Sequence, residues 1–418
     1  MAAYLPRVVD TQIAEALAHP GAIVLEGARA CGKSATGRQH AASSIQLDLD
    51  PTAVRLAELD PARLLVGARP RFIDEWQLAP SVWNQVRAAV DRDEDGRFLL
   101  AGSALPADDA TRHSGAGRML RLRMRPMALG ESGHSSAEIS LAAVVRAPTD
   151  SVSGASPITI PELAELTARG GWPGLQSLSP RLASERLRSH LDDTARIDLP
   201  RLEGESRRDP QRVLRVIRAL ARNVGTEASV ASLARDSSAG GEQPTDATVQ
   251  NYLDALTRVF VIEDQPSWGP HLRSRDKVRK APKRHFTDPS LAVAAVGADP
   301  DHLLDDLDFF GQAFESLVIR DLRTYAAPLG GVVQHYRDSA GREVDAIVEL
   351  PGGDWIGVEI KLAASREDEA AASLQRFTAN IDTSRTPPPR ALLIVTGGQY
   401  GYTRADGIHV VPIGALAA

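Results

Sequence analysis

The chain has 418 residues, a formal net charge of −6 and a pI near 6.0, and 43% of its residues are hydrophobic. That length exceeds one core of ordinary size, so we expect two or three domains, and the apolar content is sufficient to fill them. The acidic balance excludes a global basic field for nucleic acid, so any DNA binding would need a local basic patch. A single cysteine excludes an intramolecular disulfide and a multi-cysteine zinc site.

Targeting and membrane signals are missing from the sequence. The N-terminus has no basic-then-apolar signal pattern, and no uninterrupted apolar stretch approaches the ~20 residues that span a bilayer. We therefore expect a cytoplasmic protein with no membrane partner.

A phosphate-binding loop follows the first predicted strand, the apolar run 22–25. Residues 27–34 match the pattern G-x-x-x-x-G-K-[ST], in which backbone N–H groups and the next helix's N-terminus face an anion. Lys33 would reach the β- and γ-phosphates of ATP, and Ser34 would ligate Mg²⁺. The alternative is an ordinary glycine-containing turn between a strand and a helix. The residues expected to bind the nucleotide are Gly27, Ala28, Arg29, Ala30, Cys31, Gly32, Lys33, Ser34 and Ala35. Cys31 itself is either a small packing residue or a reactive thiol beside the phosphates.

A short apolar strand at 70–75 ends in two adjacent carboxylates, which is a Walker B signature. Asp74 would hold the Mg²⁺ shell, and Glu75 would orient or deprotonate the water that attacks the γ-phosphoryl group. A nucleotide sensor without hydrolysis would not need the second acid, so the pair favours an ATPase.

Three further segments add to this domain. Residues 45–49 are expected to form an extra strand, and 97–103 another strand that ends at Ser103. Ser103 is a candidate sensor of the γ-phosphate or, alternatively, a turn serine. Arg118 precedes the alternating segment 119–124, and its guanidinium could complete a site in cis or in a neighbouring subunit of a homo-oligomer. Its alternative is a solvated arginine at a strand edge.

These motifs together resemble prokaryotic AAA-superfamily ATPases whose C-terminal half is a domain of unknown function. The resemblance implies an AAA-like ATPase with ATP and Mg²⁺ as cofactors, and it covers almost the whole chain. The segments that carry it are Tyr4–Arg7, the phosphate-binding loop, Ile73–Gln77, Leu100–Ser103, Gly117–Arg118, Arg125–Glu131, Gly170–Gly174 and Lys283–Asp288.

Changes in composition and periodicity divide the chain. The expected fold class is α/β, with an AAA-like ATPase domain at 1–131, a Ser/Gly/Pro-containing linker at 132–157 and a helical region at 158–228. A winged helix-turn-helix at 229–270 and a PD-(D/E)xK-like α/β domain at 271–418 complete the chain.

The winged-helix expectation depends on a helix at 229–235, a second helix at 246–256 and a strand at 259–262. Thr248, Gln250 and Asn251 would face a DNA groove, although many winged helices dock proteins instead. A basic stretch at 273–284 follows and offers the local patch for DNA, or else a solvated loop. Its basic residues are Arg273, Arg275, Lys277, Arg279, Lys280, Lys283 and Arg284.

The C-terminal part holds a second set of acids. Glu315 lies on a helix at 314–322, Asp345 on the strand 341–348, and Glu359 and Lys361 share one face of the strand 355–361, which follows a strand at 332–337. This order is similar to the PD-(D/E)xK nuclease core. Glu315, Asp345 and Glu359 would gather Mg²⁺, and Lys361 would position water or neutralise charge on the phosphoryl oxygens. The alternative is a retained scaffold whose acids form surface salt bridges.

The expected function is therefore ATP binding and hydrolysis, with the ATP state controlling a nuclease-like domain that acts on DNA. Two alternatives remain open. The first is a regulatory ATPase switch whose inactive nuclease-like domain binds a protein or nucleic acid partner. The second is transcriptional control through the winged helix.

Overall fold

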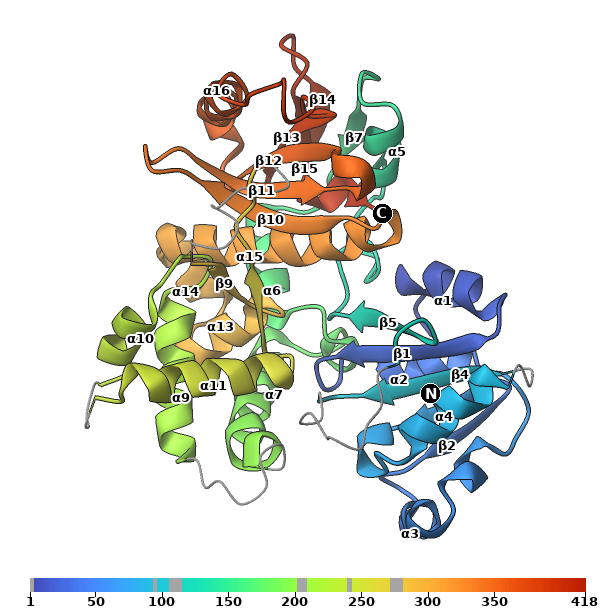
Figure 1. Cartoon of the computed structure of the whole chain (residues 1–418). Coiled ribbons are helices and arrows are strands. Elements are labelled where there is room, and N and C mark those ends of the chain that lie inside the picture. Colours follow the sequence, from blue (N-terminus) through green and yellow to red (C-terminus); the bar gives the residue numbers. More distant parts are fainter. Residues whose placement is uncertain (1–3, 93–95, 105–114, 201–208, 239–242, 271–280) are drawn as a thin grey trace.

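The computed structural model describes residues 4–92, 96–104, 115–200, 209–238, 243–270 and 281–418. Figure 1 shows three parts: an N-terminal α/β part, a helical middle part, and a C-terminal α/β part that covers the helical one. No described helix has both the length and the apolar character that a membrane crossing requires.

The N-terminal part contains a five-stranded, fully parallel sheet in the order β2-β3-β4-β1-β5. Parallel sheets are covered on both faces, so their strands are continuous apolar runs, as in Ala22–Leu25, where no residue is more than 2% exposed. The strands are β1 (Gly21–Gly27), β2 (Ser43–Gln46), β3 (Arg71–Asp74), β4 (Arg97–Gly102) and β5 (Met119–Met124).

Alternate residues of β1 face two different cores. Ile23 and Leu25 pack in the core that includes Ile13 of α1, whereas Ala22 and Val24 pack in the core that includes Trp83 of α4. The sheet is therefore sandwiched between helices. The helices are α1 (Val9–Leu17), α2 (Lys33–Gln39), α3 (Pro51–Leu59) and α4 (Val82–Asp91).

The middle part consists of capped amphipathic helices. Each begins at a Ser, Thr or Asp whose side chain accepts a backbone N–H of the first turn, and α6 carries a full capping box between Thr159 and Glu162. A two-stranded antiparallel sheet, β8 with β9, follows α11. The elements are α6 (Ile160–Arg169), α7 (Pro180–Asp193), α9 (Pro210–Arg222), α10 (Val230–Asp236), α11 (Asp246–Arg258), β8 (Ile262–Gln265), β9 (Lys283–Phe286), α13 (Pro289–Val296) and α14 (Pro300–Asp305).

One expected strand is wrong. The apolar run 259–262 is buried but forms the turn after α11, because Phe260 adopts φ 59°, and the strand begins only at Ile262. A short apolar run does not distinguish a buried turn from a buried strand.

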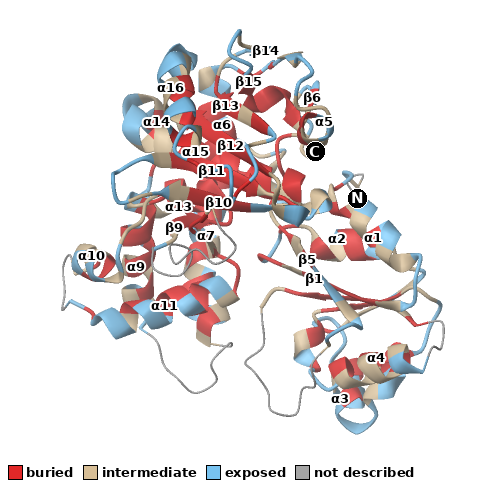
Figure 2. Ribbon diagram, turned by 45° about the horizontal axis from the view of Figure 1, so that its top comes forward, coloured by how far each residue is buried: buried red, intermediate tan, exposed pale blue. Residues whose placement is uncertain are grey.

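The C-terminal part is built on a seven-stranded sheet in the order β10-β11-β12-β13-β15-β14-β7. The long helix α15 packs on one face, against Ala346 and Val348, and α16 packs on the other, against Val344 and Ile347. Figure 2 shows that this sheet and α15 hold much of the buried interior. The elements are α15 (Leu307–Ala326), β10 (Val332–Arg337), β11 (Glu343–Glu349), β12 (Trp355–Lys361), α16 (Glu367–Thr378), β13 (Ala391–Thr396), β14 (Tyr400–Thr403), β15 (His409–Pro412) and β16 (Leu416–Ala417).

The expected linker at 132–157 is regular structure. It contains β6 (Ile139–Ser140), α5 (Leu141–Arg146) and β7 (Ser153–Ala155), and β7 pairs with β14 at the edge of the C-terminal sheet. The small residues that suggested a linker suit this edge, because a Cβ on Gly154 would approach Ile139 to 3.0 Å. The segment therefore belongs to the C-terminal fold.

Candidate active sites

The phosphate-binding loop lies between β1 and the N-terminus of α2. Gly27 passes so close to the backbone of Met124 that a Cβ would collide with it, and Gly32 adopts φ 109° just before the helix. Both positions therefore need glycine. The Lys33 Nζ donates hydrogen bonds of 2.8 Å to the carbonyls of Gly27 and Ala28, which keeps the ammonium inside the loop.

Asp74 is the last residue of β3, so it lies at the carboxyl ends of the parallel strands, as the phosphate-binding loop does. It is 2% exposed. Burial raises the pKa of its carboxyl, against the opposing effects of the Ser34 hydroxyl and the Arg38 guanidinium. Its Oδ2 is buried without a hydrogen-bond partner among the described residues, and Arg38 Nη1 lies 3.8 Å away. An orphaned carboxylate oxygen beside a hydroxyl is the oxygen donor set that Mg²⁺ takes, so these residues fit the ion.

Glu75 follows Asp74 in the left-handed backbone region, with φ 54° and ψ 42°. A glutamate is uncommon there, and such conformations cluster at active sites. Its carboxylate accepts hydrogen bonds from Gln77 Nε2 and, at 3.5 Å, from Ser103 Oγ. Burial raises the pKa of Glu75, against the effects of Gln77 and Lys33, which makes its carboxylate a better proton acceptor.

Arg118 lies just before β5, at the amino ends of the parallel strands. Its carbonyl accepts the N–H of Ala22 at the start of β1, and its Nε contacts Asp91 at 2.6 Å. The phosphate-binding loop begins at the far end of the seven-residue β1, about 20 Å away by strand rise. Arg118 therefore cannot complete the site of its own chain, and a role in a neighbouring subunit stays a prediction.

Cys31 is a packing residue. It is 0% exposed and lies in the apolar core beside Met124, whose carbonyl is 3.7 Å from its Sγ. Of the two interpretations of this thiol, the structure supports packing.

Arg7 is a residue at this site whose contacts the sequence analysis did not foresee. It is 7% exposed and donates from Nη1 to the Cys31 carbonyl at 2.9 Å and from Nη2 to the Arg125 carbonyl at 2.8 Å. Its Nε lies 3.1 Å from Glu131, whose carboxylate also accepts the backbone N–H groups of Val8 and Ala128. Arg7 thus connects the phosphate-binding loop to segment 125–131.

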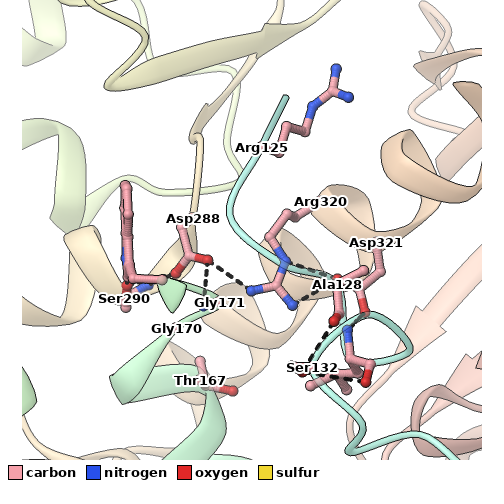
Figure 3. A network of polar contacts seen from close by, with 12 residues as sticks. Arg125, Ala128, Ser132, Thr167, Gly170, Gly171, Asp288, Ser290, Arg320 and Asp321 are labelled. Carbon is pink, nitrogen blue, oxygen red and sulfur yellow. Dashed lines mark hydrogen bonds and ion pairs between the residues drawn. The ribbon is translucent and has the colours of Figure 1, made fainter. Parts of the chain in front are cut away.

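A buried network of hydrogen bonds and ion pairs connects segment 125–131 to α15. Figure 3 shows the Arg320 guanidinium of α15 between Asp288 and Asp321, at 2.7 Å from each carboxylate. Asp321 accepts the N–H of Leu129, and Asp288 accepts the N–H of Gly171.

The glycine-rich turn 170–174 lies against the same segment. A Cβ on Gly171 would collide with the Met127 backbone, which explains the glycine and gives this turn a structural role. Arg125 in turn forms a bidentate pair with Glu263 of β8, at 2.6 and 2.8 Å. The N-terminal part therefore contacts both α15 and β8.

The predicted C-terminal acids come together around two lysines. Lys283 Nζ lies 2.8 Å from Glu315, 2.9 Å from Glu343 and 3.7 Å from Asp345. Lys361 Nζ lies 2.9 Å from Glu359 and 3.5 Å from the other oxygen of Asp345. We call these six side chains the acid cluster.

Lys283 is the member that the sequence analysis assigned elsewhere. It was expected in a basic loop, but Lys283 and Arg284 are buried in β9 and paired, Arg284 with Asp264. The expectation of a basic loop was wrong for these two residues, because the sequence shows a run of charges but not the distant acids that neutralise them. The other basic residues of the 273–284 stretch lie outside the described residues.

Burial and mutual repulsion perturb the acids strongly. Burial raises the pKa of Glu315 to about 7, opposed by Lys283, and that of Glu359 to about 8, with Asp345 adding to the rise. The pKa of Asp345 is lowered, because Lys283 and Lys361 outweigh the effect of burial. Asp345 is thus the most firmly ionised of these acids.

The cluster borders a cavity of about 400 Å³, whose lining includes Asp345, Glu359, Lys361, Arg342 and Arg376. Ser373 of α16 donates to Glu359 at 3.1 Å. However, within the described residues no group of three or more His, Cys, Asp or Glu side chains is arranged to hold a metal ion. As they stand, these acids do not fit the metal that a nuclease-like site implies.

The candidate DNA-contacting residues lie on α11. Thr248 belongs to the cap of that helix with Thr245, and Gln250 donates to Asp254 one turn later. α10, α11 and the pair β8–β9 have the expected order, but DNA contact by Thr248, Gln250 and Asn251 stays a prediction.

Three parts of the chain match known families. Residues 19–132 match the family described as AAA domain, residues 160–302 match a domain of unknown function (DUF8612), and residues 310–416 match a domain of unknown function (DUF4143). No curated protein matches the chain.

Three solved structures show low similarity to the chain. The Walker-type ATPase PABY2304 of Pyrococcus abyssi is 14% identical with a TM-score of 0.42, over 70% of this chain and 96% of that one. The Aeropyrum pernix ORC1 protein in complex with DNA is 14% identical with a TM-score of 0.24, over 73% and 97%. A complex of Thermococcus gammatolerans McrB AAA+ hexamers with bound McrC is 9% identical with a TM-score of 0.24, over 70% and 74%.

The phosphate-binding loop, the parallel sheet and the two carboxylates at its edge define a P-loop nucleotide-binding protein. With the AAA-domain match over 19–132, this part of the chain is a P-loop domain of the AAA type.

Proposed function

We propose that this chain hydrolyses ATP with Mg²⁺ and that its nucleotide state acts on the helical and C-terminal parts. The observation that carries the proposal is the convergence of Lys33, Ser34, Asp74 and Glu75 at one sheet edge. Mg²⁺ bound there would neutralise charge on the β- and γ-phosphoryl oxygens.

The protein's own groups then have distinct tasks. Lys33 exchanges its carbonyl partners for phosphate oxygens, and the backbone N–H groups of 27–35 hold the phosphates. Glu75 takes a proton from the attacking water, and Ser103, which already contacts that carboxylate, senses whether the γ-phosphate is present. Ser34 and Asp74 would hold Mg²⁺.

Arg7 supports the second half of the proposal. It contacts the phosphate-binding loop at Cys31 and segment 125–131 at two points, and that segment is bonded to α15. A shift of the loop on nucleotide exchange would therefore be felt by α15, which also carries Glu315 of the acid cluster. We propose this contact as the connection between the two sites.

Substitution of Lys33 by alanine tests the proposal. Each charged hydrogen bond to phosphate contributes about 1.5–3 kcal/mol, so we expect ATP to bind about 10- to 150-fold more weakly per bond lost. The affinity of a fluorescent ATP analogue measures this loss. Arg63→Ala is the control, because it removes a cation of the same domain that lies far from the phosphate-binding loop. The next residue, Leu64, accepts a hydrogen bond from Arg71 at the start of β3, which is the opposite end of the strand from Asp74. Equal weakening in both variants, or in neither, would contradict the assignment.

A second candidate function is metal-dependent cleavage of DNA by a PD-(D/E)xK-like C-terminal domain. Three observations favour it: Glu315, Asp345, Glu359 and Lys361 lie on the expected helix and adjacent strands, the N–H of Ile360 holds Asp345 at 2.8 Å, and a cavity opens beside them. The alternative, a regulatory switch with an inactive nuclease-like domain, uses the same fold as a binding surface for DNA or protein.

Incubation of linear, nicked and single-stranded DNA with the protein in Mg²⁺ or Mn²⁺, with and without ATP, separates the two. The nuclease predicts ATP-dependent cleavage that Lys361→Ala loses while its ATPase rate is retained. Intact DNA under all conditions favours the switch. Stimulation of ATP hydrolysis by DNA would support a nucleic-acid partner without showing cleavage.

A further inference from the structure

Lys283 lies where the acid cluster would otherwise need a cation. Its ammonium has three N–H donors, and it faces three carboxylates, those of Glu315, Glu343 and Asp345, at 2.8, 2.9 and 3.7 Å. The three acids come from α15 and β11, whereas the lysine comes from β9 of the middle part. The Lys283 ammonium, on a strand of the middle part, thus contacts three acids of the C-terminal part.

The lysine is fixed in this position. Its side chain is 4% exposed, and its strand is hydrogen-bonded on both sides, to β8 on one and to Gly225 and Thr226 on the other. A surface lysine could swing into solvent, but this one cannot leave without exposing its stem or moving β9. Removing it would take away the cation that Glu315 and Glu343 contact, whereas Asp345 would keep Lys361 at 3.5 Å.

A divalent metal at this position would exclude the ammonium. Carboxylate oxygens bind Mg²⁺ at about 2.0–2.1 Å and Ca²⁺ at about 2.3–2.6 Å. An ion between Glu315, Glu343 and Asp345 would therefore take the volume of the Lys283 Nζ and meet its positive charge at short range. The two cations cannot share these three carboxylates.

We infer that the Lys283 ammonium is the resident cation of Glu315, Glu343 and Asp345, so these three carboxylates are closed to divalent metal while β9 stays in place. The inference deepens the second candidate function, since it names what holds that site inactive, but its geometry does not depend on DNA cleavage. A motion of β9 would be required to open the site. Because β8, the partner of β9, carries Glu263, the Arg125 contact reaches this hairpin from the ATPase part.

Mn²⁺ binding to the nucleotide-free full-length chain, followed by the electron paramagnetic resonance signal of free Mn²⁺, tests the inference. We expect Lys283→Met to gain one site that binds at least about tenfold more tightly than any site of the unmodified chain. A second substitution, Asp345→Asn, should remove the gained site and so distinguish it from the phosphate-binding loop.

Arg284→Met is the matched control, since it removes the adjacent buried cation of β9, whose partner is Asp264 rather than the cluster. It should gain no Mn²⁺ site. No gain in Lys283→Met, or an equal gain in Arg284→Met, would overturn the inference.

Two further measurements keep the test decisive if Lys283→Met is less stable than the unmodified chain. Mn²⁺ should raise the melting temperature of that variant and not that of Arg284→Met, because a ligand of the folded state stabilises it. In the unmodified chain, Mn²⁺ binding at low micromolar concentration that Asp345→Asn abolishes would overturn the inference directly. Neither outcome depends on whether DNA is cut, so the inference and the nuclease proposal can fail separately.

Discussion

Glu75→Gln is expected to bind ATP with unchanged affinity and to hydrolyse it about 10²- to 10⁴-fold more slowly. The amide keeps the size of the side chain and can still bond to Gln77 and Ser103, but it cannot accept a proton from water. Among the described residues, Glu75 forms no hydrogen bond or ion pair with the phosphate-binding loop, so the loss should fall on kcat and not on binding. Single-turnover hydrolysis of radiolabelled ATP, with binding measured in parallel, gives both quantities.

Glu26→Gln is the control for Glu75. It neutralises another carboxylate, near the end of β1, which is separated from β3 by β4 in the sheet; the partner of Glu26 is Arg121, and the substitution should change kcat by only a few-fold. Normal turnover in Glu75→Gln would contradict the role of Glu75 as the base. A large loss of ATP affinity would instead indicate that the left-handed backbone at Glu75 shapes the nucleotide site itself.

The ATPase site was predictable because its chemistry is local in sequence. The spacing of Gly27, Gly32 and Lys33 encodes a loop whose backbone must face an anion, and Asp74 and Glu75 follow a short apolar strand. The parallel sheet then brings these two segments to the carboxyl ends of its strands. The position of Arg118, at the opposite ends of the strands, required the three-dimensional register.

Lys283 and Arg7 could not be placed from the sequence, because their partners are remote in the chain. Lys283 is 32 residues from Glu315, and Arg7 is 124 residues from Glu131. A run of basic residues has the same pattern whether its charges meet solvent, phosphate or buried carboxylates. The tertiary fold alone decides between them.

A similar limit applies to secondary structure. Small residues at 153–155 are compatible with a linker and with an edge strand, and the C-terminal sheet selects the strand. The expected domain boundaries stay predictions, and the AAA-domain match ends at residue 132.

Arg320→Met is expected to lower the free energy of unfolding by about 3–5 kcal/mol, the usual effect of breaking a buried ion pair from one side. The methionine fills similar space, but it leaves Asp288 and Asp321, both 0% exposed, without their cation. Those carboxylates hold Gly171 and Leu129, so the docking of the ATPase part on α15 should loosen as well (Figure 3). Chemical denaturation, with the first transition followed separately, measures the change. Arg181→Met, which breaks an exposed pair with Glu185, should cost only about 0–1 kcal/mol.

The deficit of Arg320→Met should also depend on pH. Burial already raises the pKa of Asp321 in the intact triad, and loss of the guanidinium removes an attraction that opposes this rise. A carboxyl whose pKa is higher in the folded than in the unfolded state binds more protons when folded, so stability increases as the pH falls toward its ordinary range. The variant should therefore recover part of its deficit at about pH 5 relative to about pH 8. A deficit that stays constant over this interval would mean that lost packing, and not an uncompensated carboxylate, destabilises the variant.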